Sequence, residues 1–382
     1  MTGLTERKEK KVEYIELVYD LIFVYVIGRN NALLHHIVGG FVDPLDFYAY
    51  VLCTLAVIQI WNFTMYYVNV YGRNGVRDHV FLFVNMYLMY FIGEGTRSDW
   101  QAYHTQYHIA WALILINVAA QYLIELRNQA DRPENQRQIR RMAAILLIEA
   151  ALAAAACVEF NVHRTSHLSL AAILFGMGST VAFGQRSSGS FVDFPHLTER
   201  VMLYVVFTFG EMIISLSSYF EGVLTASSFY YSLMGFLIVA GLFLTYGVFY
   251  DRIVDREKES NGLGYMLAHI FIIFALNDIT NSLEFMQEAE VALLPKILFL
   301  TVSFLTYFAF LLLAAATHSK CGSPLPGRFY WTMLGLGAAF FAVMLLLREN
   351  SAANIALSVV FVFAVFGVFY RYGKAVDGIP AE

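Results

Sequence analysis

Residues 291–317 read VALLPKILFLTVSFLTYFAFLLLAAAT, an apolar run in which Lys296 is the one charged side chain. A helix of this length, at about 1.5 Å per residue, can cross a hydrocarbon core roughly 30 Å thick. Eleven further apolar runs of at least about 17 residues fill most of the remaining chain. An open sheet would leave backbone groups unpaired in lipid, and the alternation of barrel strands is absent. The sequence therefore predicts an all-α polytopic membrane bundle of about 12 transmembrane helices. The predicted spans are 13–37, 46–71, 78–95, 102–125, 141–160, 168–184, 197–219, 226–250, 262–285, 291–317, 329–347 and 352–370.

The overall composition supports the same class. Of the 382 residues, 58% are hydrophobic and 14% are charged, and the mean hydropathy is +0.57. Both values lie outside the range of soluble domains of this size. The connectors are short, and the longest, 128–140, is predicted to be a solvated cytoplasmic loop. Residues 1–382 are therefore expected to form one membrane domain.

Basic residues alternate between connectors and so predict the orientation. Twenty of the 25 Lys and Arg residues lie in the amino-terminal segment, the even-numbered connectors and the carboxyl tail. The exceptions are Arg29, within the first span, and Arg97, Arg164, Lys296 and Arg348, on the opposite side. The positive-inside rule then places both termini in the cytoplasm. Basic residues gathered on one face suit anionic lipid, so membrane lipids are the expected partners and nucleic acid is not.

Two halves of the chain show weak similarity. Glu16 and Glu199 open the first and seventh spans, and glycine follows at Gly28 and Gly210. The second and eighth spans both end in aromatic clusters. This pattern is compatible with a six-plus-six repeat, with residues 13–185 and 186–382 as the halves, although interfacial aromatic belts alone also produce part of it.

The first span is the most polar. Glu16, Asp20, Asn31 and His35 fall near one helical stripe, which should face the bundle interior. Two interpretations of Asp20 remain open. It pairs with a nearby arginine, or it is a protonatable or cation-binding group.

The seventh span carries a second acidic candidate. Counting from its start places Glu211 near the bilayer midplane, with Gly210 allowing close backbone approach and Ser215 on the same face. Glu211 is either a functional carboxyl or a protonated structural one. Glu199 and Arg200 are expected at the cytoplasmic boundary, as a first-turn acid and an interfacial base.

The ninth span contains His269, Asn277, Asp278, Asn281 and Glu284. Asp278 is predicted at a depth similar to that of Arg29, which makes an Arg29–Asp278 pair attractive. Glu94 and Glu149 are competing partners for Arg29. A single arginine among several acids is also typical of a structural ion pair.

Histidine pairs offer weak candidates for a metal site. His104 and His108, and likewise His163 and His167, have the i,i+4 spacing that presents two imidazoles on one helical face. Neither pair has a close cysteine or carboxylate, so a metal is not required by the pattern. The sequence lacks a phosphate-binding loop, a Gly-x-Ser-x-Gly elbow, a His-Glu-x-x-His pair and a Cys-x-x-Cys motif. We therefore expect neither an enzyme nor a bound cofactor.

Several motifs resemble those of the bacterial low temperature requirement protein A family. Residues 16–24 read ELVYDLIFV, similar to the family's opening ELFFDLVFV. The run from His196 to Glu211, the motif Trp61-Asn62-Phe63-Thr64 and the aromatic run ending at Asp251 resemble later family blocks in matching order. The resemblance implies a multi-helix protein of the bacterial inner (plasma) membrane. At position 29, where the family resemblance implies a neutral polar residue, this chain has an arginine. The motif positions that carry over are Glu16, Asp20, Trp61, Asn69, His196, Glu199, Arg200, Gly210 and Glu211.

The hypothesis that these patterns favour is a proton- or cation-linked secondary transporter of a small solute or ion. Its candidate coupling or binding residues are Glu16, Asp20, Arg29, Glu211, Asn277 and Asp278, and its boundary motif is His196, Glu199 and Arg200. The alternative is a structural, sensory or lipid-handling membrane protein in which the buried acids hold helices together.

Overall fold

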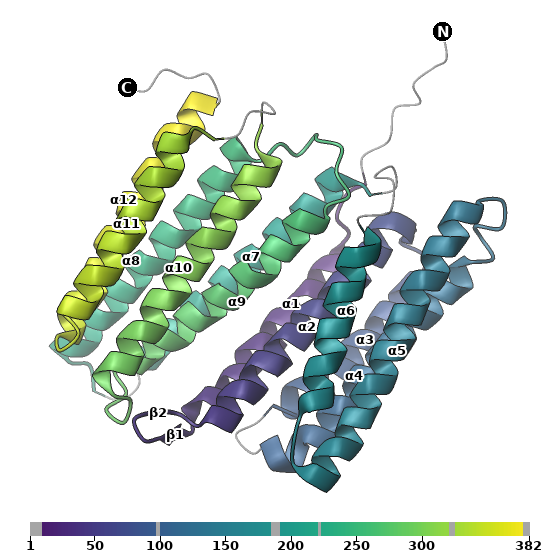
Figure 1. Cartoon of the computed structure of the whole chain (residues 1–382), viewed down its shortest axis with the longest axis horizontal. Helices are drawn as coiled ribbons and strands as arrows, with labels where there is room; N and C mark the ends of the chain where they lie inside the picture. Colours follow the sequence, from purple (N-terminus) through teal and green to yellow (C-terminus); the bar gives the residue numbers. More distant parts are fainter. Residues whose placement is uncertain (1–9, 97–99, 185–191, 221–222, 321–324, 377–382) are drawn as a thin grey trace.

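The computed structural model describes residues 10–96, 100–184, 192–220, 223–320 and 325–376. In this part of the chain twelve α-helices form one bundle, with α1–α6 on one side and α7–α12 on the other (Figure 1). The helices are α1 Tyr14–Asn30, α2 Pro44–Tyr71, α3 Val76–Glu94, α4 Trp100–Glu125, α5 Pro133–His163, α6 His167–Gly184, α7 Phe194–Ser215, α8 Ala226–Val248, α9 Leu263–Phe285, α10 Leu293–His318, α11 Gly327–Leu346 and α12 Ser351–Val376. The shorter elements are the 3₁₀ turns η1 Asn31–His35 and η2 Leu216–Phe220, the π-helical turn η3 Phe249–Ile253, and the hairpin strands β1 Ile37–Val38 and β2 Phe41–Val42.

The all-α polytopic architecture is confirmed. Ten helices are long and apolar enough to cross a membrane. The other two are α3, which carries Arg77 and Asp78 in its first turn and Glu94 at its end, and the shorter α6. Charged residues at both ends of α3 leave a short apolar centre, so this helix spans only with its ends in the interface.

One predicted span agrees with the structure to within two residues, and one predicted loop was wrong. The first span ends at His35, because the 3₁₀ turn η1 continues α1 beyond Asn30. Gly39 and Gly40, with φ of +63° and +89°, then turn the chain into a hairpin. The expected loop at 128–140 is helical from Pro133 onward. Proline at the first helical position, followed by Glu134 in the first turn, is a strong start signal that the apolar pattern hides.

The two groups of six helices share packing features. Helix α1 packs on α3, and α7 packs on α9, while α1 and α7 contact each other between the groups. Both α1 and α7 continue into a 3₁₀ turn of five residues. The six-plus-six repeat stays a prediction, and these shared features support it.

Helix α2 occupies the centre of the bundle. It contacts α1, α4, α6, α7 and α9, and 78% of its apolar window is buried, against 28% for α11. Polar side chains on α2 therefore face other helices and not lipid. Each of them needs a partner within the bundle or a water-filled space.

Candidate functional site

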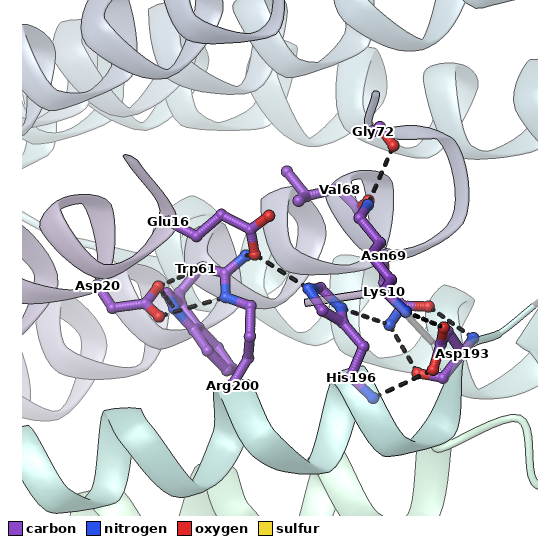
Figure 2. A network of polar contacts seen from close by, with 10 residues as sticks. All are labelled: Lys10, Glu16, Asp20, Trp61, Val68, Asn69, Gly72, Asp193, His196 and Arg200. Atoms are coloured by element: carbon purple, nitrogen blue, oxygen red, sulfur yellow. Dashed lines mark hydrogen bonds and ion pairs between the residues drawn. The ribbon is translucent and has the colours of Figure 1, made fainter. Parts of the chain in front are cut away.

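A buried ion-pair cluster joins α1 to α7, and Arg200 lies at its centre (Figure 2). The guanidinium donates to both carboxylate oxygens of Asp20, through Nε at 3.3 Å and through Nη2. Its Nη1 lies 3.2 Å from Glu16 Oε2. The indole Nε1 of Trp61 donates to Asp20 at 2.7 Å. Arg200 is 1% exposed, so its side chain faces the bundle interior, and its place at the cytoplasmic boundary stays a prediction.

His196 extends the cluster toward the start of α7. Asn69 Nδ2 donates to His196 Nδ1 at 3.0 Å, which leaves the proton on Nε2, and Nε2 lies 3.2 Å from Glu16 Oε2. Asn69 also exchanges two hydrogen bonds with the backbone of Asp193, whose carboxylate caps α7. The imidazole orientation is therefore fixed from both sides.

Lys10 lies at the end of this cluster that is nearest the start of α7. Its ammonium donates to the carbonyl oxygens of Val68 and, at 3.1 Å, Gly72, where α2 ends. The Val68 carbonyl also accepts from Gly72 N at 3.0 Å, so the ammonium adds a charged donor at the carboxyl end of α2, where a cation is favoured. Burial lowers the pKa of Lys10, and Glu16 and two further carboxylates, Asp78 and Asp193, act in the opposite direction.

The geometry of this cluster suits the positioning of helices better than the binding of a ligand. One arginine faces two carboxylates, and Asp20 accepts hydrogen bonds from both Arg200 and Trp61. The geometry favours the ion-pair interpretation of Asp20, with Arg200 as the partner. Glu199, next in sequence, is exposed and takes no part in the cluster. A buried, hydrogen-bonded pair of this kind fixes how two helices dock.

Arg29 and Asp278, the pair favoured above, do not contact each other. Arg29 Nη2 lies 3.7 Å from Glu94 Oε1, and both side chains are nearly two-fifths exposed. Asp278 instead accepts a hydrogen bond of 2.6 Å from Tyr50 on α2. A partially exposed arginine at the end of α1 reaches the end of α3, because these two helices pack together.

The amides near Asp278 form a network with the end of α1. Asn277 Nδ2 donates to Tyr50 at 2.8 Å and to Asn31 at 2.9 Å, and Asn281 Nδ2 donates to Asn31 at 3.0 Å. All of these groups are buried. The network joins α9 to η1, at the end of α1, and to α2. It lies toward the opposite end of α1 from the residues that contact Arg200.

Glu211 lies against Gly28 of α1. A Cβ atom at position 28 would be 2.6 Å from Glu211 Oε1, whereas a Cβ at Gly210 would meet nothing within 4 Å. The close approach therefore occurs on α1 and not at Gly210. His35 Nε2 lies 4.0 Å from Glu284 Oε2 at the same end of the bundle. Whether Glu211 couples ion movement stays a prediction.

Among the described residues, neither histidine pair belongs to a group of three or more side chains with metal-ligand spacing. His104 and His108 both lie on α4, but each Nδ1 bonds a backbone carbonyl and His108 Nε2 bonds Ser169. His163 ends α5 and His167 begins α6, because Arg164 adopts a left-handed φ of +56° between them. The i,i+4 spacing therefore does not place that pair on one helix. Among the described residues, the one group with metal-ligand spacing is His36, Asp43 and Asp46.

A cavity of about 80 Å³ lies between α2, α5, α6 and the start of α9. This space is large enough for several water molecules or a small solute. Apolar and polar groups both line it. The polar groups are Gln59, Asn62, Gln138, Arg141, Thr180 and Asn261.

Several polar atoms at this cavity have no hydrogen-bond partner in the described part of the chain. They are both side-chain polar atoms of Asn62 and Oε1 of Gln59. Oε1 of Glu149, beside Gln59 but outside the cavity lining, also has no partner among the described residues. Glu149, on α5, is fully buried behind Gln59, whose Nε2 donates to it at 3.2 Å. From the sequence, Glu149 is expected only as a partner for Arg29. The missed signal was a carboxyl in an apolar helix with no basic residue one turn away.

Comparison with known proteins agrees with the motif resemblance. The family model described as "Bacterial low temperature requirement A protein (LtrA)" matches residues 11–367. No curated protein and no solved structure matches the chain significantly. Six of the nine family motif positions, namely Glu16, Asp20, Trp61, Asn69, His196 and Arg200, meet in the single cluster of Figure 2. The chain is a polytopic membrane protein and belongs to the bacterial low temperature requirement A family.

Proposed function

We propose that the protein is a secondary transporter that couples the movement of a small solute to a proton or another cation. The observation that carries this proposal is the cavity between α2, α5, α6 and α9. Helices from both halves of the chain line it, and substrate sites of secondary transporters lie between such halves. The unpartnered amide atoms of Gln59 and Asn62 at its wall can bond a polar group that enters it.

The Arg200 cluster supplies a contact about which the halves can move. Residues of α1 and α2 lie on one side of it and residues of α7 on the other (Figure 2). An ion pair of this kind keeps two helices in register while the surfaces beside it separate. Glu16 and Asp20 then position helices, and the coupling group is found elsewhere.

The proposal also covers partners and location. We place the protein in the bacterial inner membrane, with lipids and a small solute or ion as its partners, and we assign it no enzymatic activity and no nucleic-acid partner. The cavity lies between helices of both halves. Its lining is mostly apolar with six polar side chains, which suits a small solute that has both apolar and polar parts.

Solute uptake into proteoliposomes tests the proposal. Vesicles with an imposed pH gradient are exposed to pools of amino acids, sugars, organic acids and inorganic cations, and charge movement is recorded on a solid-supported membrane. We expect one pool to give a gradient-dependent current. Thr180→Trp, which fills the cavity, should abolish the current, whereas Thr332→Trp, on an exposed position of α11, should preserve it.

A structural role is the second candidate, and the saturated partners of Asp20 favour it. Under that role no pool produces a current, and Thr180→Trp changes only thermal stability. A current that both tryptophan variants retain would place the transport route outside this cavity.

A further inference from the structure

We infer that Glu149 on α5 is the proton-binding group of this cavity and that Gln59 on α2 connects it to the solute. The inference rests on the proposed function, because it names the coupling group of the same cavity. Three observations carry it: the isolation of Glu149 from cations, its link to the cavity wall, and a close approach by α6.

Glu149 has an unusual set of neighbours for a buried acid. Its side chain is 0% exposed, its Oε2 accepts one hydrogen bond from Gln59, and its Oε1 has no partner within the described chain. Glu125 on α4 is equally buried but pairs with Arg73 and Arg77 and also accepts from two amides. The two arginines therefore compensate the buried charge of Glu125, whereas no cation compensates that of Glu149 in the described chain.

An unpaired carboxylate in a membrane interior is too costly to persist. It must be neutralised by a proton or by a bound cation. Among the described residues Glu149 has no ion-pair partner, and the hydrogen bond from Gln59 is the one polar contact of its side chain. The titratable groups that line the cavity are Arg141 on α5 and Tyr66 on α2.

Gln59 supplies the route between the carboxyl and the cavity. Its side chain lines the cavity, its Nε2 donates to Glu149 Oε2, and its own Oε1 is unpartnered. In the binding step, a hydronium ion passes from the cavity beyond Gln59, transfers its proton to Glu149 Oε1 and leaves as water. The negative charge disappears, and the Gln59 hydrogen bond to Oε2 is retained.

Helix α6 approaches this pair through Gly176. A Cβ atom at that position would lie 1.9 Å from Gln59 Nε2 and 2.0 Å from Glu149 Oε2. Only glycine fits there while both side chains keep their places. Gly178, two residues along the same helix, has open space around it and provides a matched control.

Infrared difference spectroscopy of the full chain in lipid nanodiscs tests the inference directly. Between acidic and alkaline pH, the wild type should show the loss of a protonated-carboxyl band. E149Q should remove that component, and E125Q should leave it unchanged. G176A should shift the band, because the methyl group displaces both partners, whereas G178A should not. An E149Q spectrum identical to that of the wild type would overturn the inference.

Two further measurements distinguish a wrong assignment of Glu149 from a wrong proposed function. If sodium chloride removes the band at constant pH while choline chloride does not, the bound cation is sodium and the proton assignment is wrong. Solute currents report on transport separately from the infrared signal. A Glu149-dependent band without any solute current would contradict the proposed function but not the assignment of Glu149. A solute current that survives in E149Q would contradict the assignment of Glu149 but not the proposed function. G176A keeps the test informative if E149Q does not fold.

Discussion

Arg200 determines how α1 and α7 meet, because it brings a planar donor group to two carboxylates on one face of α1. Glu16 and Asp20 are one turn apart, and the guanidinium reaches both of them from the other half of the chain. A bidentate contact of this kind is sensitive to the shape of the cation as well as to its charge.

Replacing Arg200 with glutamine should destabilise the protein by about 3–5 kcal/mol, because it leaves two buried carboxylates without a cation. Thermal unfolding in detergent, followed by tryptophan fluorescence, measures the loss. Glu199→Gln is the matched control, since the neighbouring side chain is exposed and its replacement should change stability by about 0.5 kcal/mol or less. Equal effects for the two variants would contradict a central role for the Arg200 cluster.

Gly28 and Glu211 provide a second test at this scale. Gly28→Ala should cost about 1 kcal/mol, because the new methyl group meets Oε1 of Glu211 at 2.6 Å and the flexible carboxylate must move. The cost should vanish in a Glu211→Ala background, as a double-mutant cycle of unfolding free energies would show. Gly210→Ala has open space and should stabilise α7 slightly. A cost that persists without Glu211 would mean that the methyl group clashes with something else.

Sequence motifs identified most members of the Arg200 cluster but not how they pair. Glu16, Asp20 and Arg200 were each picked out, yet the pairing joins residues 180 positions apart. No local spacing encodes such a contact, because it depends on how α1 and α7 pack. Depth estimates also failed for Arg29 and Asp278, since similar depth does not make two helices neighbours.

At the scale of elements, the connection between α1 and α2 departs most from a hydropathy reading. The chain leaves α1 through η1, forms the β1–β2 hairpin, and enters α2 with Asp43 as a cap whose carboxylate accepts from Leu45 and Asp46. Apolar residues continue through this connection, so hydropathy shows neither the change from α-helix to 3₁₀ turn at Asn31 nor the hairpin. The two glycines mark the hairpin, and the Asp-Pro pair marks the start of α2.

His36 gives this connection a pH dependence. The hydrogen bond of 2.7 Å to Asp46 raises the pKa of His36 above its usual value. The stabilisation is therefore present in full below the unfolded pKa and is lost as the pH rises through the higher folded pKa. The melting temperature of the wild type should exceed that of His36→Gln at about pH 5, and the difference should shrink by about pH 8. His79→Gln, which removes a histidine bonded to Asn74, is the control, and a constant difference across pH would argue against the His36–Asp46 pair.

At the scale of the whole molecule, three sets of hydrogen bonds and ion pairs link the two groups of helices, in addition to the packing of α1 and α2 on α7 and α9. They are the Arg200 cluster between α1 and α7, the Tyr50 and Asn31 network with α9, and the hydrogen bond of 2.7 Å from Ala292 N to Gly40 O. Class and helix number followed from composition and apolar run length, because lipid permits few alternatives. The cavity was beyond prediction, since four helices distant in sequence must pack before it exists.

Orientation and the direction in which the cavity opens are tested together by labelling with a membrane-impermeant maleimide. Basic residues place the ends of α5 and α6 that border the cavity on the cytoplasmic side, so Thr180→Cys should label in inverted vesicles and not in right-side-out vesicles. Glu290→Cys, exposed between α9 and α10, should show the reverse pattern. Both are made after Cys53, Cys157 and Cys321 are replaced by serine, and labelling is read as a mass shift. A reversed pattern at both sites would invert the topology. Labelling of Glu290→Cys alone would mean that the cavity is closed to the cytoplasm, and the solute would then have to enter from the opposite side.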